Sequence, residues 1–231
     1  MATTERTDRL QRLAALQAAG VQPYPARTRR THTCASVRAS FAELMEQKAP
    51  VVIAGRIRAI RGHGKSSFLV LEDASARMQV YAKADVLGDS YAQVELLDVG
   101  DFLEAEGMCF RTKTGEESIE AHRVAILTKT LEPLPEKWHG LTDTEIRYRH
   151  RELDLIANPE VRAIAVWRAE IVKFIRGYFE QHHFLEVETP ILQPIPGGAN
   201  ARPFVTHHHA LDEDRYLRIA PELYLKRLVV G

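Results

Sequence analysis

The sequence predicts an α+β protein in which a five-stranded β-barrel, preceded by helices, is followed by the beginning of a second domain. Three observations predict this class. Between Val51 and Leu127, apolar and polar residues alternate in five runs, as they do in half-buried strands. Before these runs, leucines recur at helical spacing. After them, the stretch EPLPEKWHGLTDTE has two prolines, few apolar residues and no periodicity, which is typical of a domain boundary.

Length and composition are those of a globular protein. The 231 residues are 45% hydrophobic, which is enough for two cores of ordinary size. The 31 basic and 31 acidic residues cancel, so the net charge indicates neither a nucleic acid nor a membrane partner, and any charged binding surface must be local. No apolar run has the length of a membrane span, and the N-terminal residues lack a signal-peptide core, so a cytoplasmic location is expected.

Neither the cysteines nor the histidines predict a metal site. Cys34 and Cys109 are far apart and lack Cys-x-x-Cys spacing, so we expect reduced thiols. The run His207–His209 would alternate between faces in an extended segment, so at most two rings could converge. No acidic or cysteine residue stands at a ligand-like spacing from this run, and the histidines are therefore expected to be ordinary hydrogen-bonding side chains.

Two helices are predicted ahead of the barrel, in residues 1–48. The segment Thr4–Gly20 places Leu10, Leu13 and Leu16 at helical spacing and ends on a glycine, a common helix stop. The sequence VQPYPARTRRTHT lacks periodicity and contains two prolines, which predicts an extended connection. A short second helix is predicted over VRASFAELMEQ.

The five predicted strands fall in residues 49–131. They are Val51–Arg61, Ser66–Asp73, Arg77–Ala82, Asp101–Thr112 and Glu117–Leu127, with a helix over Ala84–Leu97 between the third and the fourth. The glycines of GHGK and KTGE suit the turns between runs. Five strands with a helix in this position is the layout of an OB-fold barrel. An SH3-like barrel is the alternative, although it would not usually carry that helix.

Strand alternation predicts which side chains lie on the outer face of the barrel. If Leu69, Leu71 and Met78 point inward, then Phe68 and Gln79 point outward on adjacent strands. An exposed ring beside an amide suits a reader of single-stranded bases, since the ring stacks on a base and the amide bonds to its edge.

A local cluster of positive charge lies close to these residues. Arg56, Arg58, Arg61 and Lys65 fall within ten residues that contain no acid, which predicts a positive stripe for phosphates. The alternative is an ordinary half-exposed barrel face with solvated arginines.

A linker is predicted over residues 132–160 and a second domain over 161–231. The segment NPEVRAIAVWRAEIVKFIRGYFEQHHF opens with a helix start and predicts an amphipathic helix of about twenty residues. Its apolar face consists of Ile164, Trp167, Ile171, Phe174, Ile175 and Tyr178. The sequence HFLEVETP predicts a strand that ends at Pro190, because proline cannot donate to a ladder. On its own, this pattern is equally that of a plain helix–strand unit.

Two features of the second domain fit a small-ligand site. Gly197 and Gly198 let the backbone approach a ligand closely, although a tight turn between prolines would also explain them. Glu222 follows Pro221 at a predicted helix start, where the helix dipole alone favours a carboxylate by about 0.3 to 1 kcal/mol.

The barrel segment GRIRAIRGHGKSSFLVLED, followed by RMQVYA, resembles the anticodon-binding OB domain of the class II aminoacyl-tRNA synthetases for lysine, aspartate and asparagine. The resemblance implies that Arg61, Phe68 and Gln79 bind the central anticodon uridine. Arg61 has the strand parity of the inward-facing residues before it, so only a bulge or a strand end near Gly62 would turn it outward. The TGEE turn resembles the family's TGE turn, which implies an anticodon contact for Glu116.

The second domain resembles the start of the antiparallel-sheet catalytic domain of lysyl-tRNA synthetases. HFLEVETP resembles motif 1, which implies that Pro190 lies at a homodimer interface. PGGANARPFVTH and LRIAPELYLKRLVVG resemble the lysine-binding region, which implies that Gly198 contacts lysine and Glu222 binds its α-amino group. The family usually has GGAAARPF and THHNALD here, so Asn200 and His209 depart from its pattern.

The resemblance covers almost the whole chain and implies a lysine–tRNA ligase reaction. Lysine and ATP would form lysyl-adenylate, and the lysyl group would pass to tRNA(Lys), with Mg²⁺ and arginines neutralising the phosphates. In the family, the residues that handle ATP and Mg²⁺ lie downstream of the segment that matches Gly231. We therefore expect neither catalytic residues nor metal ligands in this chain, and expect it to bind the anticodon without forming adenylate.

Three alternatives stay open at the level of sequence. The first is a stand-alone, non-catalytic tRNA-binding module. The second is an aspartyl- or asparaginyl-type synthetase relative. The third is a paralogue that lysylates a translation factor, which would normally lack the barrel.

Overall fold

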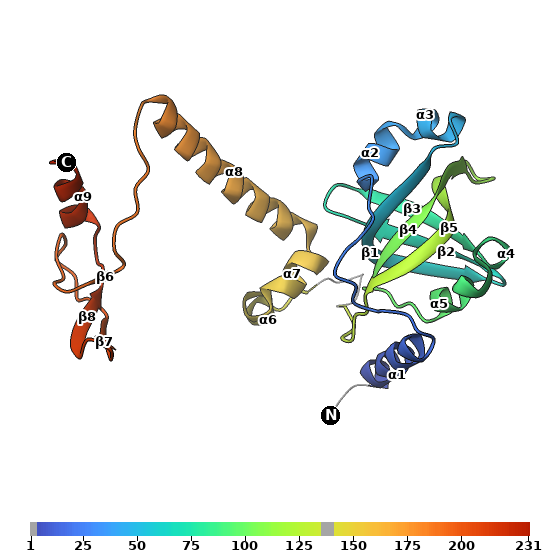
Figure 1. Cartoon of the computed structure of the whole chain (residues 1–231), viewed down its shortest axis with the longest axis horizontal. Coiled ribbons are helices and arrows are strands. Elements are labelled where there is room, and N and C mark those ends of the chain that lie inside the picture. The colour runs from blue at the N-terminus through green and yellow to red at the C-terminus, as the bar shows by residue number, and fades with distance from the viewer. Residues whose placement is uncertain (1–3, 135–140) are drawn as a thin grey trace. The chain divides into compact units, whose positions relative to one another are not determined.

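The computed structural model describes residues 4–134 and 141–231, which form two compact units that meet in sequence between Asn158 and Pro159. The first unit contains a closed five-stranded barrel, and the second contains helices and a three-stranded antiparallel sheet (Figure 1). The predicted α+β class is thus confirmed.

All five predicted strands of the barrel are confirmed. They are β1 (Pro50–His63), β2 (Ser66–Glu72), β3 (Arg77–Lys83), β4 (Phe102–Arg111) and β5 (Glu117–Thr128). The strands close in the order β1-β2-β3-β5-β4, and only the β3–β5 pair is parallel. This is the topology expected of the OB fold, in which closure leaves no long unpaired edge.

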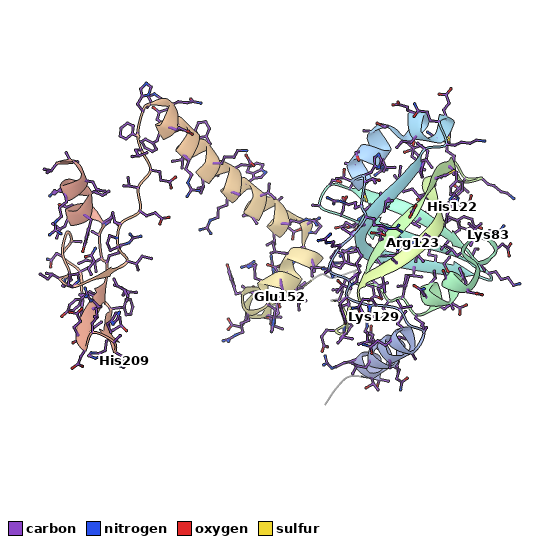
Figure 2. The ribbon with its side chains drawn as sticks, in the orientation of Figure 1. Lys83, His122, Arg123, Lys129, Glu152 and His209 are labelled. Carbon is purple, nitrogen blue, oxygen red and sulfur yellow. The ribbon has the colours of Figure 1, made fainter. Side chains whose placement is uncertain are left out.

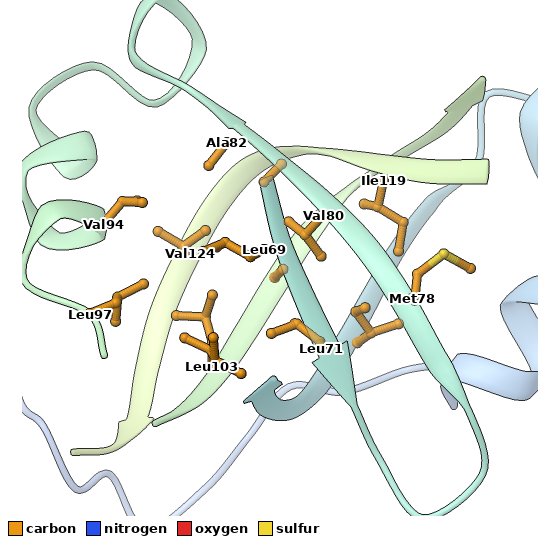
Figure 3. Close-up of a cluster of buried hydrophobic side chains, with 14 of the residues drawn as sticks. Leu69, Leu71, Met78, Val80, Ala82, Val94, Leu97, Leu103, Ile119 and Val124 are labelled. Carbon is orange, nitrogen blue, oxygen red and sulfur yellow. The ribbon is translucent and has the colours of Figure 1, made fainter. Parts of the chain in front are cut away.

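The interior of the barrel is filled from all five strands (Figure 3). Leu69, Leu71 and Met78 are buried, as the alternation predicted, because successive side chains of a strand point to opposite faces. Further buried residues are Ile53, Ile57, Val80, Leu103, Ile119 and Val124 from the strands, and Val94 and Leu97 from the segment between β3 and β4.

Where β1 pairs with β2, it carries one extra residue. Ile57 lies opposite Leu71, but the next pair is Ala59 with Val70, so Arg58 is the extra residue of a β-bulge. Before the bulge, Val51, Ile53, Gly55 and Ile57 are buried, and after it Arg61 lies on the outer face. The bulge therefore reverses the parity of the strand.

The predicted single helix over Ala84–Leu97 is wrong in detail. The segment forms α4 (Ala84–Leu87), a 3-10 turn η1 (Gly88–Ser90) and α5 (Tyr91–Glu95). Gly88 has a φ of +55°, which interrupts α-helical geometry and which glycine adopts without strain.

The predicted second helix is also divided, into α2 (Cys34–Ala39) and α3 (Phe41–Glu46). Ser40 separates them with a non-helical backbone, φ −106° and ψ 21°. A capping box starts α2, since Thr33 and Ser36 each accept a hydrogen bond from the other's backbone N–H.

The first helix forms as predicted, but its buried face differs from the predicted leucine stripe. In α1 (Thr4–Ala18), Leu10 is 40% exposed and Arg9 is only 3% exposed. The guanidinium of Arg9 donates hydrogen bonds to the carbonyl oxygens of Val99 at 3.2 Å and Thr130 at 3.1 Å. The helix thus docks through a buried cation as well as through its apolar face.

A buried ionic cluster around Lys129 lies where α1 meets the barrel (Figure 2). Lys129 is 2% exposed, and its Nζ atom donates to Asp101 at 2.7 Å, to Asp98 and to the carbonyl oxygen of Leu96 at 2.9 Å. Asp98 also pairs with Arg12 of α1. A buried charge is tolerated only when it is paired and hydrogen-bonded, and this cluster meets that requirement.

The two cysteines, expected to be thiols, are free, and both are buried. Burial and the nearby Asp73 carboxylate raise the pKa of Cys34 to about 12. A thiol with this pKa stays protonated near neutral pH, so Cys34 behaves as a small apolar residue.

The segment expected to be a linker contains two short helices, α6 (Thr144–Arg149) and α7 (Arg151–Ala157). Asp143 starts α6 by accepting a hydrogen bond from the backbone N–H of Ile146 at 2.9 Å. Residues 135–140 of the expected linker lie outside the described part of the chain.

The second unit begins with the predicted long helix, α8 (Pro159–Gln181). It continues with the strands β6 (Leu192–Gln193), β7 (Val205–His208) and β8 (Glu213–Leu217), in the order β6-β8-β7, and with the helix α9 (Glu222–Leu228).

The strand predicted over HFLEVETP is not formed, which corrects that expectation. Residues 184–190 carry no strand assignment, and Pro190 is exposed. A β-strand requires a partner for its backbone groups, and the described residues offer none to this segment.

The Asp73 carboxylate ties β2 to α2, and its loss is expected to destabilise the barrel unit. Burial opposes its ionisation, but hydrogen bonds from Ser75 and from the backbone N–H groups of Cys34 and Ala76 outweigh this and lower the pKa to about 2. Asp73→Ala should reduce the free energy of unfolding by about 1 to 2 kcal/mol at neutral pH.

The same pKa predicts the pH dependence. Because the folded-state pKa lies below the ordinary value of 3.8, the carboxylate's contribution is complete above about pH 5 and is lost as the pH falls toward 2. Urea unfolding followed by circular dichroism should therefore show the variant and the wild type converging in acid. The exposed Asp85 serves as a control, and Asp85→Ala should change stability by less than about 0.5 kcal/mol.

Removing the cation of the buried cluster should destabilise the barrel unit strongly. Lys129→Ala leaves Asp101 buried without its ammonium partner, and the expected loss is about 3 to 5 kcal/mol in urea unfolding. Lys65→Ala removes the same charge from the exposed surface and should change stability by less than about 0.5 kcal/mol. A loss at Lys129 no larger than at Lys65 would contradict the role of the cluster.

Candidate functional site

A pocket of about 490 Å³ opens on the outer face of the barrel. The four residues predicted to contact an anticodon, Arg61, Phe68, Gln79 and Glu116, all line it. They come from three strands and a turn, and up to 55 residues of sequence separate them. We call this site the base pocket, and its other lining residues are Tyr81, Phe110, Thr112, Lys113 and Thr114.

Arg61 lies on the outer face because of the bulge in β1. It is exposed and pairs across the ladder with Phe68, whose side chain therefore lies on the same face. The sequence required a bulge or strand end near Gly62 for this orientation. The structure supplies the bulge at Arg58, earlier in the strand.

Three aromatic rings form one wall of the base pocket. Phe68 and Tyr81 are stacked, with ring centroids 4.7 Å apart and planes 26° apart. Tyr81 in turn contacts Phe110, with centroids 5.9 Å apart. Tyr81 and Phe110 were not among the predicted site residues, although Tyr81 shares the strand parity of Gln79 and could have been found from it.

The amide of Gln79 is held in place at the pocket. The residue is 8% exposed, and its Nε2 donates a hydrogen bond of 2.9 Å to the hydroxyl oxygen of Ser118. These two residues are direct partners in the parallel β3–β5 pair. The bond restrains the amide, so a ligand edge would meet a preorganised polar group.

Glu116 lies in the turn between β4 and β5, which is internally hydrogen-bonded. Its backbone N–H donates to the hydroxyl of Thr112, and its carbonyl accepts from the N–H of Thr112, both at 3.0 Å. Gly115 has a φ of +86°, a conformation that favours glycine at this tight turn. The turn thus presents an exposed carboxylate at the rim of the pocket.

The predicted positive stripe is only half available to phosphates. The guanidinium of Arg56 lies 4.4 Å from the ring centroid of Phe102, and Arg58 pairs with Glu72 at 3.4 Å. Burial lowers the pKa of Arg56, and the neighbouring Arg58 lowers it further. These two arginines make contacts within the fold, whereas Arg61 and Lys65 are exposed.

The structure also brings together the two residues predicted to bind lysine. Gly198 has a φ of +87°, and a Cβ atom placed on it would lie 3.0 Å from the Cβ of Glu222 and 3.2 Å from that of Ala220. A Cβ on Gly197 would lie 2.6 Å from Leu223 Cδ1. Both glycines therefore pack closely against the start of α9, and the positive φ of Gly198, which adjoins the Glu222 carboxylate, is the conformation that favours glycine.

Glu222 already binds an ammonium group within the chain. Its carboxylate pairs with Lys226 one turn along α9. Glu222 occupies the first turn of the helix, directly after Pro221. The carboxylate thus has the position and charge that an amino-acid ammonium would need.

The histidine run differs from its prediction in one respect. His207 lies 3.0 Å from Asp214 and 3.3 Å from Asp212, so the fold supplies acidic partners that the linear spacing did not indicate. Among residues 4–134 and 141–231, however, no three His, Cys, Asp or Glu side chains converge as a metal site requires.

Comparison with known protein families matches both halves of the chain. Residues 51–127 match the family of OB-fold nucleic acid binding domains, and residues 143–231 match the class II tRNA synthetases for aspartate, lysine and asparagine. This chain is homologous to the lysine–tRNA ligases. Relatives with that name are 53% identical in Carboxydothermus hydrogenoformans, 53% in a Roseiflexus species and 49% in Xanthomonas campestris, over 96%, 96% and 97% of this chain.

The chain spans about half the length of these relatives, 46% in each of the three. The homology therefore concerns the barrel and the beginning of the synthetase domain, as the sequence predicted. No helix in the described part of the chain is long and apolar enough to cross a bilayer.

Proposed function

We propose that the whole protein is a lysine–tRNA ligase and that this chain supplies its anticodon reader and part of its lysine pocket. The observation that carries the proposal is the base pocket, because Arg61, Phe68, Gln79 and Glu116 converge there from distant parts of the sequence. In the proposed reaction, lysine and ATP form lysyl-adenylate with release of pyrophosphate, and the lysyl group then passes to tRNA(Lys) in the cytoplasm with release of AMP.

In the proposed anticodon complex, the central uridine enters the base pocket. Its base stacks on Phe68, which is backed by Tyr81 and therefore loses little freedom on binding. Uracil presents two carbonyl oxygens and one N–H on its edge, and the amide of Gln79 can both donate and accept a hydrogen bond. Arg61 and Glu116 at the rim would bind the sugar–phosphate backbone and a neighbouring base edge.

In the proposed lysine pocket, formed by Gly198 and Glu222, the binding groups are also held in place before the ligand arrives. The Glu222 carboxylate would receive the α-ammonium of the substrate, and Gly198, whose backbone lies against Glu222, would contact the bound lysine. ATP and Mg²⁺ would supply the phosphate chemistry of the whole enzyme. The residues described here would bind and orient lysine rather than handle the phosphates.

A homodimer of the whole protein is part of the proposal. Pro190 and the apolar face of α8 would contribute to its interface, and Trp167 and Phe174 of that helix are 72% and 73% exposed in the isolated chain. Exposed rings of this size are typical of surfaces that bind another protein.

Anticodon binding is tested by removing the stacking ring. Phe68→Ala should weaken binding of tRNA(Lys) by about 1 to 3 kcal/mol, the usual contribution of a base–aromatic stack, in a filter-binding titration. Phe102→Ala provides a control, because Phe102 is an aromatic residue of the same barrel that does not line the base pocket. Equal affinities for the wild type and Phe68→Ala would identify the ring as purely structural.

Because the proposal assigns lysine and anticodon binding, but not phosphate chemistry, to this chain, these 231 residues alone should form no adenylate. Lysine-dependent ATP–pyrophosphate exchange should be undetectable with this chain, while tRNA(Lys) binding is retained. Measurable exchange would show that the chain handles ATP by itself.

A stand-alone tRNA-binding module is the second candidate function. It is favoured by one observation, namely that every lining residue of the base pocket belongs to the barrel unit. Lysine binding separates the candidates: the ligase predicts that lysine raises the melting temperature of the whole protein and that Glu222→Gln abolishes the effect, whereas the module predicts no effect.

A further inference from the structure

A second hollow, of about 510 Å³, adjoins the base pocket on the barrel surface. The two share Gln79 and Glu116 as a common wall. We call the second site the arginine hollow, because three of its lining residues are Arg38, Arg77 and Arg111. Its other lining residues are Val70, Met78, Gly115 and Glu117.

Two of the three guanidinium groups are fixed by contacts within the fold. Arg77 pairs with Glu72 at 2.5 Å across the β2–β3 turn. Arg111 pairs with Glu117 at 2.8 Å and lies over the ring of Phe41, 5.5 Å from its centroid. These contacts leave both side chains half exposed, with side-chain exposures of 56% and 50%.

Arg38 is the least engaged of the three. It lies in the last turn of α2, and its guanidinium donates a long hydrogen bond of 3.5 Å to the carbonyl oxygen of Arg77. A guanidinium carries five N–H donors in a planar fork, so most of its donor capacity is available to a ligand. Arg77 and Arg111 are each paired with a glutamate, so the capacity of the hollow to bind an anion rests mainly on the donors of Arg38.

The position of the hollow indicates which anion would enter it. A nucleotide whose base lies in the base pocket is followed along the strand by another nucleotide and its phosphate, which must leave the pocket past one of its walls. The wall formed by Gln79 and Glu116 leads directly to the arginines. Guanidinium groups bind phosphate in a bidentate geometry, which adds orientation to charge attraction.

We propose that the arginine hollow binds the backbone phosphate of the nucleotide adjacent to the one whose base is read, with Arg38 as its principal donor. This inference rests on the proposed anticodon function and adds a subsite to it. The base pocket then supplies discrimination between bases, while the arginine hollow supplies affinity independent of sequence and fixes the direction of the strand.

The test uses the 231-residue chain and two RNA hairpins, one with uridine and one with cytidine at the central anticodon position. Affinity is measured by fluorescence anisotropy over a range of salt concentrations. Arg38→Gln should bind the uridine hairpin about three- to tenfold more weakly at about 0.1 M salt. The slope of log affinity against log salt should fall by about 0.7, the value for one phosphate contact on a single strand. The ratio of affinities for the two hairpins should be unchanged.

Two further variants make the result specific. Arg27→Gln removes the same charge from a different hollow of the barrel unit, which shares no residue with these two sites, and should leave the slope unchanged. Arg38→Lys keeps the charge and should restore the slope with part of the affinity. An unchanged slope in Arg38→Gln, or an equal change in Arg27→Gln, would overturn the phosphate subsite.

Failure of the subsite and failure of the proposed function give different results. If the wild type prefers uridine and Gln79→Ala loses that preference, the base pocket is supported whatever Arg38 does. If the wild type binds both hairpins equally, the anticodon function itself is wrong.

Discussion

The bulge at Arg58 in β1 is the constraint on which the candidate site depends. Strand side chains alternate between two faces, so a single extra residue exchanges the faces for the rest of the strand. Ahead of the bulge, Ile53 and Ile57 fill the barrel, and after it Arg61 stands beside Phe68 on the outer surface. Arg58 is the extra residue, and its side chain pairs with Glu72 on the neighbouring strand. One strand can therefore contribute side chains to both the core and the base pocket.

Buried charge, rather than apolar packing alone, joins the N-terminal helix to the barrel. Lys129, Asp98 and Asp101 form a cluster that Arg12 of α1 extends, and Arg9 of the same helix bonds to carbonyl oxygens at that end of the barrel. Such groups tolerate few alternative positions, since a displaced partner leaves a charge in a medium of low polarity. The cluster therefore specifies how α1 docks, and the base pocket is formed by other strands and loops of the barrel.

In both candidate sites, the groups that would contact a ligand are held in place by other parts of the fold. In the barrel, Phe68 is backed by Tyr81 and Gln79 is tethered to Ser118, so the groups offered to a base are held before it arrives. In the second unit, the glycines at 197 and 198 pack against α9, which sets the backbone beside the Glu222 carboxylate. Groups ordered in advance lose less conformational entropy on binding, so each contact contributes more of its energy to affinity.

The sequence by itself determined the local features of this protein. Its periodicities predicted five strands, their inward residues and the long helix α8, because alternation and helical spacing depend on neighbouring residues alone. The resemblance to a synthetase family named Arg61, Phe68, Gln79 and Glu116 as one site. Only the tertiary structure decided what depends on partners distant in sequence: the place of the β1 bulge, the stacking of Tyr81 and Phe110, the burial of Arg9 and Lys129, and the loss of a strand before Pro190. Each of these features depends on a residue that folding brings close, such as a ladder partner, an aromatic ring or an opposite charge. The spacing of residues along the sequence does not indicate such contacts.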